Sequence, residues 1–321
     1  MRYKIVVYRT IEEQVLQYLR KDNEVIYIKE LTPENIPYFM KHIQNADALI
    51  GSGLKIDAEL LENCQNLKVV SNISVGTDNL DLPLLKQKSI VATNTPHVLD
   101  ESVADIVFGL LLSVARRITE LDKYIRDGKW ETTIGEELFG RDVHGKVVGI
   151  VGLGNIGEAV AKRAYAGFGM DVLYHNRSRN TNAEEYYNAE YTSLEELLNR
   201  SDYVVNLIPA NQTTEKYFGE NEFASMQTHA FFINASRGSI VDEQALYSAL
   251  VSREIAGAAL DVFQIEPTKA SHPLFSLSNI VVTPHIGSAT KETRRKMQMV
   301  AADCVLKVFA GEQPLYIIDK M

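Results

Sequence analysis

Short apolar runs alternate with amphipathic, helix-like stretches along most of the chain. In the first hundred residues the apolar runs predict five strands, and the stretches between them have the periodicity of surface helices. The predicted strands are Tyr3–Tyr8, Glu24–Ile28, Ala48–Gly51, Leu67–Asn72 and Ile90–Thr93. The predicted helices lie near Ile11–Arg20, Pro33–Gln44, Asp57–Asn63 and Leu82–Lys88. This alternation is typical of βα units built around a parallel sheet.

A second alternating series begins at Lys146, after a long helical pattern that runs from Asp100 to about Arg126. Its predicted strands are Val147–Val151, Asp171–Tyr174, Tyr203–Leu207, Ala230–Asn234, Gly257–Val262 and Ile280–Thr283. Its predicted helices are Ile156–Phe168, Ser193–Asn199, Glu243–Val251 and a last one at about Ala289–Phe309, before the extended run Pro314–Ile318. Six strands separated in this way match a doubly wound dinucleotide-binding fold.

The two series predict an α/β protein of two domains, and 321 residues suffice for two domains of ordinary size. Short hinges are expected near His97–Asp100 and Pro284–Ser288. The Rossmann domain, residues 99–288, would then be inserted into a smaller α/β domain formed by residues 1–98 and 289–321.

Composition narrows the classes of function. The formal net charge of -9 argues against a nucleic-acid partner or an anionic membrane surface. Cys64 and Cys304 are far apart and lack metal-ligand or redox spacing, so we expect no metal site and a reducing compartment. The N-terminus reads as a first strand instead of a signal peptide, and no apolar run is long enough to span a membrane. The sequence therefore predicts a cytoplasmic protein.

The motif Gly152-Leu153-Gly154-Asn155-Ile156-Gly157 is the first candidate for chemistry. A G-x-G-x-x-G motif alone is weak, but this one follows an apolar strand and opens a helical pattern, as a dinucleotide site requires. Gly152 would permit the tight turn, Gly154 the approach of a pyrophosphate, and Gly157 close packing of helix on strand. The phosphates would lie at the helix N-terminus, next to unpaired N–H groups.

The residues after the second Rossmann strand indicate which cofactor binds. A site for NAD places Asp or Glu at the end of that strand, to bond the ribose 2′-hydroxyl. Here the strand leads into Asn176, Arg177, Ser178 and Arg179, and no carboxylate follows before Glu184. Arginines can instead bind a 2′-phosphate through charge-assisted bonds. We therefore expect NADP(H) to be preferred, with NAD(H) as a second cofactor, and these four residues as its phosphate contacts.

Three charged side chains follow predicted strands of the second series, namely Arg237, Glu266 and His285. Because ligands of open α/β sheets bind at the carboxyl ends of strands, all three could reach one crevice. Hydride chemistry on an oxo acid needs a cation that binds the substrate, a proton donor and a group that tunes the donor. These three residues supply that set.

The surrounding motifs resemble those of the D-isomer-specific 2-hydroxyacid dehydrogenase family. The similarity covers essentially the whole chain, with the motifs in matching order, and is greatest to the branch of glyoxylate/hydroxypyruvate and 2-ketogluconate reductases. The motifs are Gly152–Gly157, Ser74–Asp78, Asn234–Gly238, Ala259–Phe263 with Glu266-Pro267, and Thr283–Ser288. The resemblance implies a Rossmann domain inserted into a flavodoxin-like substrate domain, both with parallel sheets, and a homodimer. The family uses the region around Trp130 in its dimer contact, and a simple packing role for Trp130 is the alternative.

The resemblance also implies a role for each matching residue. His285 would be the acid and base, since imidazole titrates near neutrality, and Glu266 would orient it and favour its protonated form. Arg237 would bind the substrate together with the backbone N–H groups of Val75 and Gly76. The implied cofactor contacts, besides those named above, are Asn155, Ile156, Ala235, Ser236, Asp261, Gly287 and Ser288, with Asp261 facing the nicotinamide carboxamide.

The sequence thus predicts NADPH-dependent reduction of small 2-oxo acids, such as glyoxylate, hydroxypyruvate or 2-ketogluconate, to D-2-hydroxy acids. An NAD-dependent D-lactate or D-3-phosphoglycerate dehydrogenase is an alternative, which the missing acidic residue after the second strand opposes. A dinucleotide-sensing corepressor of the same fold is an alternative from another class of protein. Turnover of an oxo acid would exclude a purely binding role.

Overall fold

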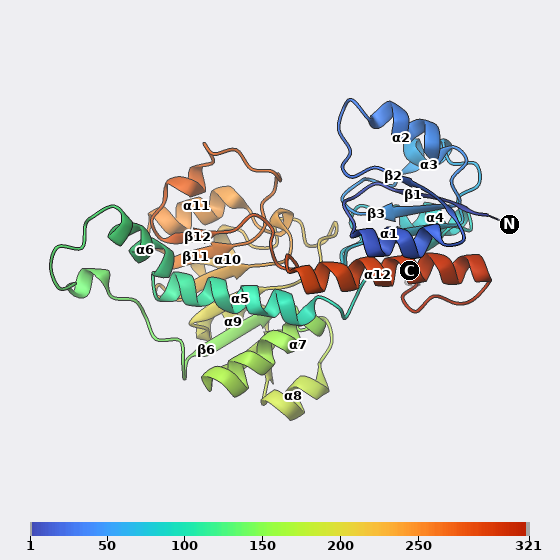
Figure 1. Ribbon diagram of the computed structural model, residues 1–321. Helices are drawn as coiled ribbons and strands as arrows, with labels where there is room; N and C mark the ends of the chain where they lie inside the picture. Colours follow the sequence, from blue (N-terminus) through green and yellow to red (C-terminus); the bar gives the residue numbers. More distant parts are fainter. Residues whose placement is uncertain (1, 319–321) are drawn as a thin grey trace. The chain divides into compact units, whose positions relative to one another are not determined.

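Two parallel sheets organise the chain, one in each of two compact units (Figure 1). The computed structural model describes residues 2–318. The first unit contains the chain up to Leu99 and again from Thr290 onward, and the second unit is Asp100–Ala289. This arrangement confirms the predicted α/β architecture of two domains with parallel sheets.

The sheet of the first unit has the strand order β2-β1-β3-β4-β5, which is the flavodoxin-like order. Its strands are β1 Lys4–Val7, β2 Glu24–Tyr27, β3 Ala48–Gly51, β4 Val69–Asn72 and β5 Val91–Thr93. Its helices are α1 Glu13–Arg20, α2 Ile36–Ile43, α3 Ala58–Glu62, α4 Leu82–Gln87 and α12 Lys291–Ala310. Figure 1 shows α1 and α12 on one face of this sheet and α2 and α3 on the other.

Apolar residues of β1, β3 and β4 are buried on both faces because helices cover the sheet from both sides. Val6, Leu49 and Val70 pack with Phe39 of α2 and Leu61 of α3 in one core cluster. Side-chain caps fix where several of the helices begin. The caps are Asp57 for α3, Asp81 for α4 and Thr290 for α12.

The sheet of the second unit has the order β12-β11-β10-β9-β6-β7-β8, with the reversal of a Rossmann fold at β6. Its strands are β6 Val147–Val151, β7 Asp171–His175, β8 Glu190–Tyr191, β9 Tyr203–Asn206, β10 Phe231–Asn234, β11 Gly257–Leu260 and β12 Ile280–Val282. Its α-helices are α5 Asp100–Ala115, α6 Ile118–Arg126, α7 Asn155–Lys162, α8 Thr181–Tyr187, α9 Leu194–Arg200, α10 Glu220–Ala224 and α11 Glu243–Val251.

The second core lies between this sheet and helices α9, α10 and α11. Leu197, Phe223 and Leu246 represent these helices in a cluster that also contains Phe232 of β10. Helix α5 packs on β10, β11 and β12 and alongside α7. The strands therefore end in loops whose starting points are fixed by buried apolar side chains.

The long helix expected from Asp100 to about Arg126 is wrong, because α5 ends at Ala115 and α6 begins at Ile118. Arg117 between them has a left-handed backbone with φ 57°. The returning chain explains the break: the Arg141 N–H donates to the Ala115 carbonyl at 2.8 Å, and Gly140 lies against the same turn. Tertiary contacts thus replace the hydrogen bonds that would continue the helix.

Two further expectations also need correction. The sheet of the second unit has seven strands instead of six, because Glu190–Tyr191 adds the short edge strand β8 beside β7. The run Pro314–Ile318 forms only an isolated bridge between Ile317 and Thr93. Both segments are too short for a periodic pattern to be read from the sequence. Among residues 2–318, no helix is long and apolar enough to cross a membrane.

Candidate active site

The glycine-rich loop between β6 and α7 has a backbone that only glycine fits at two positions. Gly152 has φ 101°, and a Cβ there would lie 2.6 Å from the Ile208 nitrogen. A Cβ on Gly157 would lie 2.7 Å from the Gly152 carbonyl oxygen, so α7 packs directly against the turn. Around Gly154, by contrast, a Cβ would meet nothing within 4 Å. The loop is therefore tightly packed at Gly152 and Gly157, and it leaves space for a ligand at Gly154.

Helix α7 begins at this opening, with Gly154 as its N-cap. The first N–H groups of a helix, here those of Asn155 and Ile156, have no carbonyl of their own helix to bond. These groups and the helix dipole favour an anion at this position. The residues present therefore fit the pyrophosphate of a dinucleotide, which Gly154, Asn155 and Ile156 would hold.

The four residues predicted as phosphate contacts lie in the loop after β7, and they differ in whether they already have partners. Asn176 bonds the backbone of Leu153 twice, accepting its N–H at 2.7 Å and donating to its carbonyl at 3.0 Å. Arg179 is paired with Glu184 through two bonds of 2.9 and 2.8 Å. Arg177 and Ser178 are exposed, and within the described chain no ionic partner faces the Arg177 guanidinium. Asn176 thus shapes the glycine loop, and Arg177 is the available cation.

The loop after β10 carries Arg237 and is held by two buried asparagines. The Asn234 amide nitrogen donates to the Arg237 carbonyl at 3.1 Å, and its oxygen accepts the Ser236 N–H at 3.1 Å. Asn206 donates to the same oxygen at 3.1 Å, while the Ser236 hydroxyl donates to the Ile208 carbonyl. Arg237 is half-buried and also bonds the Ser236 carbonyl at 2.8 Å. Its backbone position is therefore fixed by side chains from two neighbouring strands.

The loop after β12, which carries His285, is anchored on the buried carboxylate of Asp261. One oxygen of Asp261 accepts the Thr283 hydroxyl at 2.6 Å and the Ile286 N–H at 2.8 Å. The other oxygen accepts the Gly287 N–H at 2.8 Å. His285 itself has φ 53°, and its N–H donates to the Asp261 carbonyl at 2.8 Å. Asp261 thus holds His285 in a left-handed conformation that a histidine rarely adopts.

The imidazole of His285 and the carboxylate of Glu266 form a direct pair, with 2.7 Å between Nδ1 and Oε2. Their side chains are 46% and 36% exposed, so the pair is accessible from outside. The other Glu266 oxygen accepts the Phe263 N–H at 2.9 Å. Burial acts to raise the pKa of Glu266, but the bonds from His285 and Phe263 and the charge of Arg237 outweigh it and lower the pKa below its ordinary value.

This arrangement leaves one ring nitrogen of His285 for chemistry. Because a carboxylate only accepts, Nδ1 carries the proton of the shared bond, and Nε2 is the free atom. A proton donor or acceptor therefore stands beside a carboxylate that stays ionised at neutral pH, and Arg237 is close enough for its charge to act on that carboxylate. The structure brings these three predicted residues of the second unit together at the carboxyl edge of its sheet.

The remaining cofactor residues predicted in this unit lie in the same two loops. Ala235 and Ser236 follow β10, and Gly287 and Ser288 follow β12. Gly287 also accepts a hydrogen bond from the Ser102 hydroxyl at 3.0 Å, which ties the loop to the first turn of α5. All four positions are therefore at the carboxyl edge, as the sequence predicts for cofactor contacts.

Val75 and Gly76 lie in the first unit, in the loop after β4. Asparagine side chains bind their carbonyl groups. The Asn94 amide donates to the Val75 carbonyl and the Asn72 amide to the Gly76 carbonyl, both at 2.9 Å. Among the described residues their N–H groups meet no acceptor. Two free, fixed N–H donors at the carboxyl edge of a parallel sheet form a suitable site for a carboxylate.

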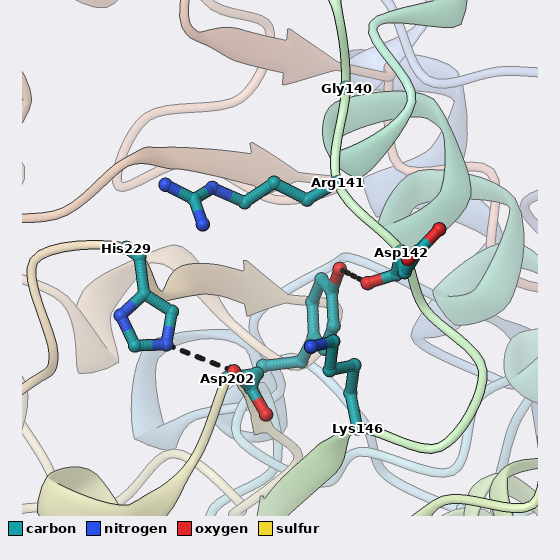
Figure 2. A pocket seen from close by; sticks show the side chains of 7 residues that line it. Gly140, Arg141, Asp142, Lys146, Asp202 and His229 are labelled. Carbon is teal, nitrogen blue, oxygen red and sulfur yellow. Dashed lines mark hydrogen bonds and ion pairs between the residues drawn. The ribbon is translucent and has the colours of Figure 1, made fainter.

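A polar pocket of about 340 Å³ lies elsewhere in the second unit (Figure 2). Lys146, Asp202 and His229 in its wall come just before β6, β9 and β10, which places it at the amino edge of the sheet. Figure 2 shows His229 and Asp202 pointing toward one another, with 2.9 Å between Nε2 and Oδ1. The other Asp202 oxygen accepts the Val147 N–H at 2.9 Å. These bonds tie strand ends together, and the pocket is separate from the His285 site.

The architecture and the site define a dehydrogenase that binds a nicotinamide dinucleotide. Residues 108–287 match the model of the D-isomer specific 2-hydroxyacid dehydrogenase NAD binding domain. The chain belongs to the D-isomer specific 2-hydroxyacid dehydrogenase family. It is 44% identical over 311 residues to glyoxylate/hydroxypyruvate reductase B of Klebsiella pneumoniae subsp. pneumoniae, covering 97% of this chain and 96% of that protein. The resemblance to this family and branch is thereby confirmed.

Two solved structures extend the comparison. The NADPH-dependent glyoxylate/hydroxypyruvate reductase of Sinorhizobium meliloti, in complex with NADP and malonate, is similar with a TM-score of 0.87 and 31% identity, over 99% of this chain and 97% of that one. The D-lactate dehydrogenase of Aquifex aeolicus, with NAD and lactic acid, has a TM-score of 0.88 and 25% identity, over 98% and 99%. Since the two relatives bind different cofactors, the preference of this chain must be argued from its own residues.

Several residues that position the site were not predicted from the sequence. Asn234, Asn72 and Asn94 hold the loops of Arg237 and of Val75-Gly76, and Thr283 binds Asp261. The available signal was a polar residue at the end of an apolar strand, where a buried side chain needs a hydrogen-bond partner. Gly238 is a further residue of this kind. A Cβ on Gly238 would overlap the backbone carbonyl of Phe263, so the Arg237 loop lies directly against the Glu266 loop.

We predict that Gly238→Ala forces these two loops apart. Because the obstruction is backbone, the variant should lose about 1–3 kcal/mol of unfolding free energy and part of its kcat/KM as well. Denaturant unfolding and steady-state kinetics measure both. Gly109→Ala is the control, since its Cβ would meet nothing within 4 Å and it lies inside α5, where alanine is preferred. A Gly238→Ala variant with the stability and kinetics of the parent protein would contradict the close approach.

Proposed function

We propose that this protein reduces small 2-oxo acids, such as glyoxylate, hydroxypyruvate and 2-ketogluconate, to D-2-hydroxy acids with NADPH. The observation that carries the proposal is the 2.7 Å pair between Glu266 and His285, close to the charge of Arg237. Membership of the family and the names of the relatives support the class of substrate. The bound nicotinamide would supply the hydride, and the residues of the chain would do the rest.

His285 would give the proton from Nε2 to the carbonyl oxygen of the substrate. Glu266 would keep Nδ1 protonated and stabilise the imidazolium, because its own lowered pKa keeps the carboxylate ionised. Arg237 would bind the substrate and polarise its carbonyl group, which favours the alkoxide that develops in the transition state. In the oxidation of a hydroxy acid, the neutral Nε2 would accept the proton instead.

The two units would divide binding between them. Residues 1–98 and 289–321 would form the substrate domain, in which the free N–H groups of Val75 and Gly76 take the substrate carboxylate. Residues 99–288 would form the cofactor domain, with the pyrophosphate at Gly154–Ile156. The role of Asp261 toward the nicotinamide carboxamide stays a prediction, because its three hydrogen bonds to the His285 loop give it a structural task already.

The preference for NADPH would rest mainly on Arg177. A carboxylate near the 2′-position would repel a phosphate, and the first one that follows Arg177 along the chain, Glu184, is bound by Arg179 and by the Tyr174 hydroxyl. Arg177 therefore offers an unpaired guanidinium, which binds a phosphate through charge-assisted bonds. The second candidate is an NAD-linked D-2-hydroxyacid dehydrogenase. It would require Glu184 to leave its present partners and bond the ribose of NAD.

A cytoplasmic location also stays a prediction. Cys64 and Cys304 are both free thiols, which is consistent with the reducing compartment that the sequence suggests.

The catalytic pair makes a prediction about pH. The pKa of Glu266 is lowered, so its carboxylate should stay ionised on the His285 ring at neutral pH, and the pairing should be lost only as pH falls through that lowered pKa. In Glu266→Gln no carboxylate orients the His285 ring, so kcat/KM for glyoxylate should fall by about 10- to 100-fold across the measured pH range. His285→Ala should lose on the order of 100- to 10,000-fold in turnover at every pH. Steady-state kinetics between pH 5 and 10, with NADPH and glyoxylate, measure these effects.

Two results would sink the proposal. One is tight dinucleotide binding with no turnover of any 2-oxo acid, which would favour a protein that only senses the cofactor. The other is near-normal turnover in His285→Ala, which would assign the proton donor elsewhere. An unchanged kcat/KM in Glu266→Gln would remove Glu266 from the mechanism without affecting the reaction class.

A separate prediction concerns the cofactor. In Arg177→Ala, kcat/KM for NADPH should fall by about 10- to 100-fold, because bonds to a charged phosphate are lost, while the value for NADH should change little. Lys162→Ala is the matched control, since this exposed cation at the far end of α7 has no part in the proposed site. Equal efficiencies with NADPH and NADH in the parent protein, unchanged in Arg177→Ala, would refute the 2′-phosphate contact.

We also propose that the protein is a homodimer joined through α6 and the segment that follows it. No residue of α6 is buried, and it contacts α5. Five large apolar side chains of this region are more than 40% exposed, which is unusual for a monomer. They are Ile118, Ile125, Trp130, Ile134 and Phe139. An apolar hollow beside Trp130, lined also by Leu121 and Tyr124, would receive a side chain from the second copy.

The expected oligomer can be broken at one position. Ile125→Asp places a charge in this apolar surface, so it should convert the dimer to a monomer at micromolar concentration. Sedimentation equilibrium or light scattering after size exclusion gives the mass. Tyr186→Asp is the control, because Tyr186 is 65% exposed on α8, outside this surface. A parent protein that is monomeric, or an Ile125→Asp variant that remains dimeric, would exclude this interface.

A further inference from the structure

Two arginines lie near each other in the first unit, at the carboxyl edge of its sheet. Arg9 follows β1 and Tyr8, and Arg294 is in the first turns of α12. The start of α12 is fixed next to the β1–α1 connection, where the Gln298 side chain accepts the Glu12 N–H at 2.8 Å. The same turns of the helix thus lie close to the segment that carries Arg9.

Of the two side chains, Arg9 is exposed and Arg294 has the unusual environment. Arg294 is half-buried, and burial, followed by the positive charge of Arg9, lowers its pKa from the ordinary value. In the part of the chain that the structure describes, neither side chain has an acidic or hydrogen-bonding partner. Other partly buried arginines do have one: Arg163 is paired with Glu101 and Asp105 at 2.7 Å each. A half-buried cation beside a like charge is unfavourable unless an anion joins it.

The position of Arg9 shows where such an anion would lie. Its Nη1 is 3.8 Å from the place that a Cβ on Gly53 would take, so the guanidinium covers the loop after β3. Strand β3 is the immediate neighbour of β4, and neighbouring strands are about 4.8 Å apart. The loop after β4 carries the free N–H groups of Val75 and Gly76. The N-terminus of α12, capped by Thr290, adds further positive potential at this edge.

We propose that Arg9 and Arg294 form a second anion subsite, which binds the anionic group at the far end of a short 2-oxo acid. The 1-carboxylate of the same molecule would be held by the N–H groups of Val75 and Gly76. The subsite rests on the proposed function and refines its range of substrates. Its ligand is a dicarboxylic or phosphorylated 2-oxo acid, since guanidinium groups bind both anions through paired hydrogen bonds.

The subsite would act on selection and not on the hydride step. Glyoxylate and hydroxypyruvate have no second anionic group, so they would gain nothing from it. A substrate with such a group would neutralise two positive charges that otherwise repel each other. The gain therefore belongs to binding and is expected mainly in KM, with a smaller change in kcat.

The test compares matched substrates with the full chain and saturating NADPH. Hydroxypyruvate is the reference, oxaloacetate and 2-oxoglutarate carry a distal carboxylate, and 3-phosphohydroxypyruvate carries a phosphate. In Arg294→Gln and Arg9→Gln, kcat/KM for the preferred distal-anion substrate should fall by about 10- to 100-fold, mainly through KM, against a few-fold at most for hydroxypyruvate. The control Lys296→Gln removes one exposed charge from the same helix and should change neither value.

The outcomes separate the two levels of the proposal. If no 2-oxo acid is turned over, the proposed function fails. If hydroxypyruvate is reduced but none of the distal-anion substrates is, or if both classes decline equally in the variants, the subsite is wrong and the function stands. The distal-anion substrate with the highest kcat/KM shows whether the subsite binds a carboxylate or a phosphate. Thermal unfolding checks that the variants are folded: Arg294→Gln should melt no lower than the parent, because it relieves repulsion between like charges.

Discussion

The buried carboxylate of Asp261 is the constraint on which the catalytic loop depends. It is 1% exposed, and no cation pairs with it among the described residues, so its three hydrogen bonds must compensate for burial. All three donors belong to residues 283–287. In the conformation in which the loop satisfies the carboxylate, His285 also has φ 53° and its ring bonds Glu266. The geometry of His285, the proposed proton donor, is thus coupled to the hydrogen bonds of a buried carboxylate.

The same principle explains which parts of the fold and site could be predicted. Strands whose apolar runs are buried on both faces, such as β3 and β6, were predicted to within a residue or two, because burial dictates their composition. Arg237 and His285 follow such strands, so topology places them at one edge. The break at Arg117 depends on a contact with Arg141, made by a segment that returns from a loop, and no local pattern contains that information.

Residues that position the site are harder to predict than residues that react. Asn234 and Asn72 are ordinary asparagines in the sequence, and their roles appear only when two backbone groups of a loop face them. Asn176 is the opposite case, a predicted ligand contact that turns out to position the loop. Its polarity and place after β7 suggested a phosphate contact, yet its amide serves the Leu153 backbone on both sides. A polar residue at a ligand loop can stabilise the loop itself, and sequence alone does not distinguish the two tasks.

Each unit has hydrogen bonds of its own that fix its part of the proposed site. The bonds that fix Val75 and Gly76 come from Asn94 and Asn72, within the first unit. The bonds that fix His285 come from Asp261 and Glu266, within the second. The first unit therefore offers fixed donors for anions, and the second offers a proton and a cofactor loop. Preorganisation of this kind keeps donors aligned before substrate arrives, so little ordering remains to be done during the reaction.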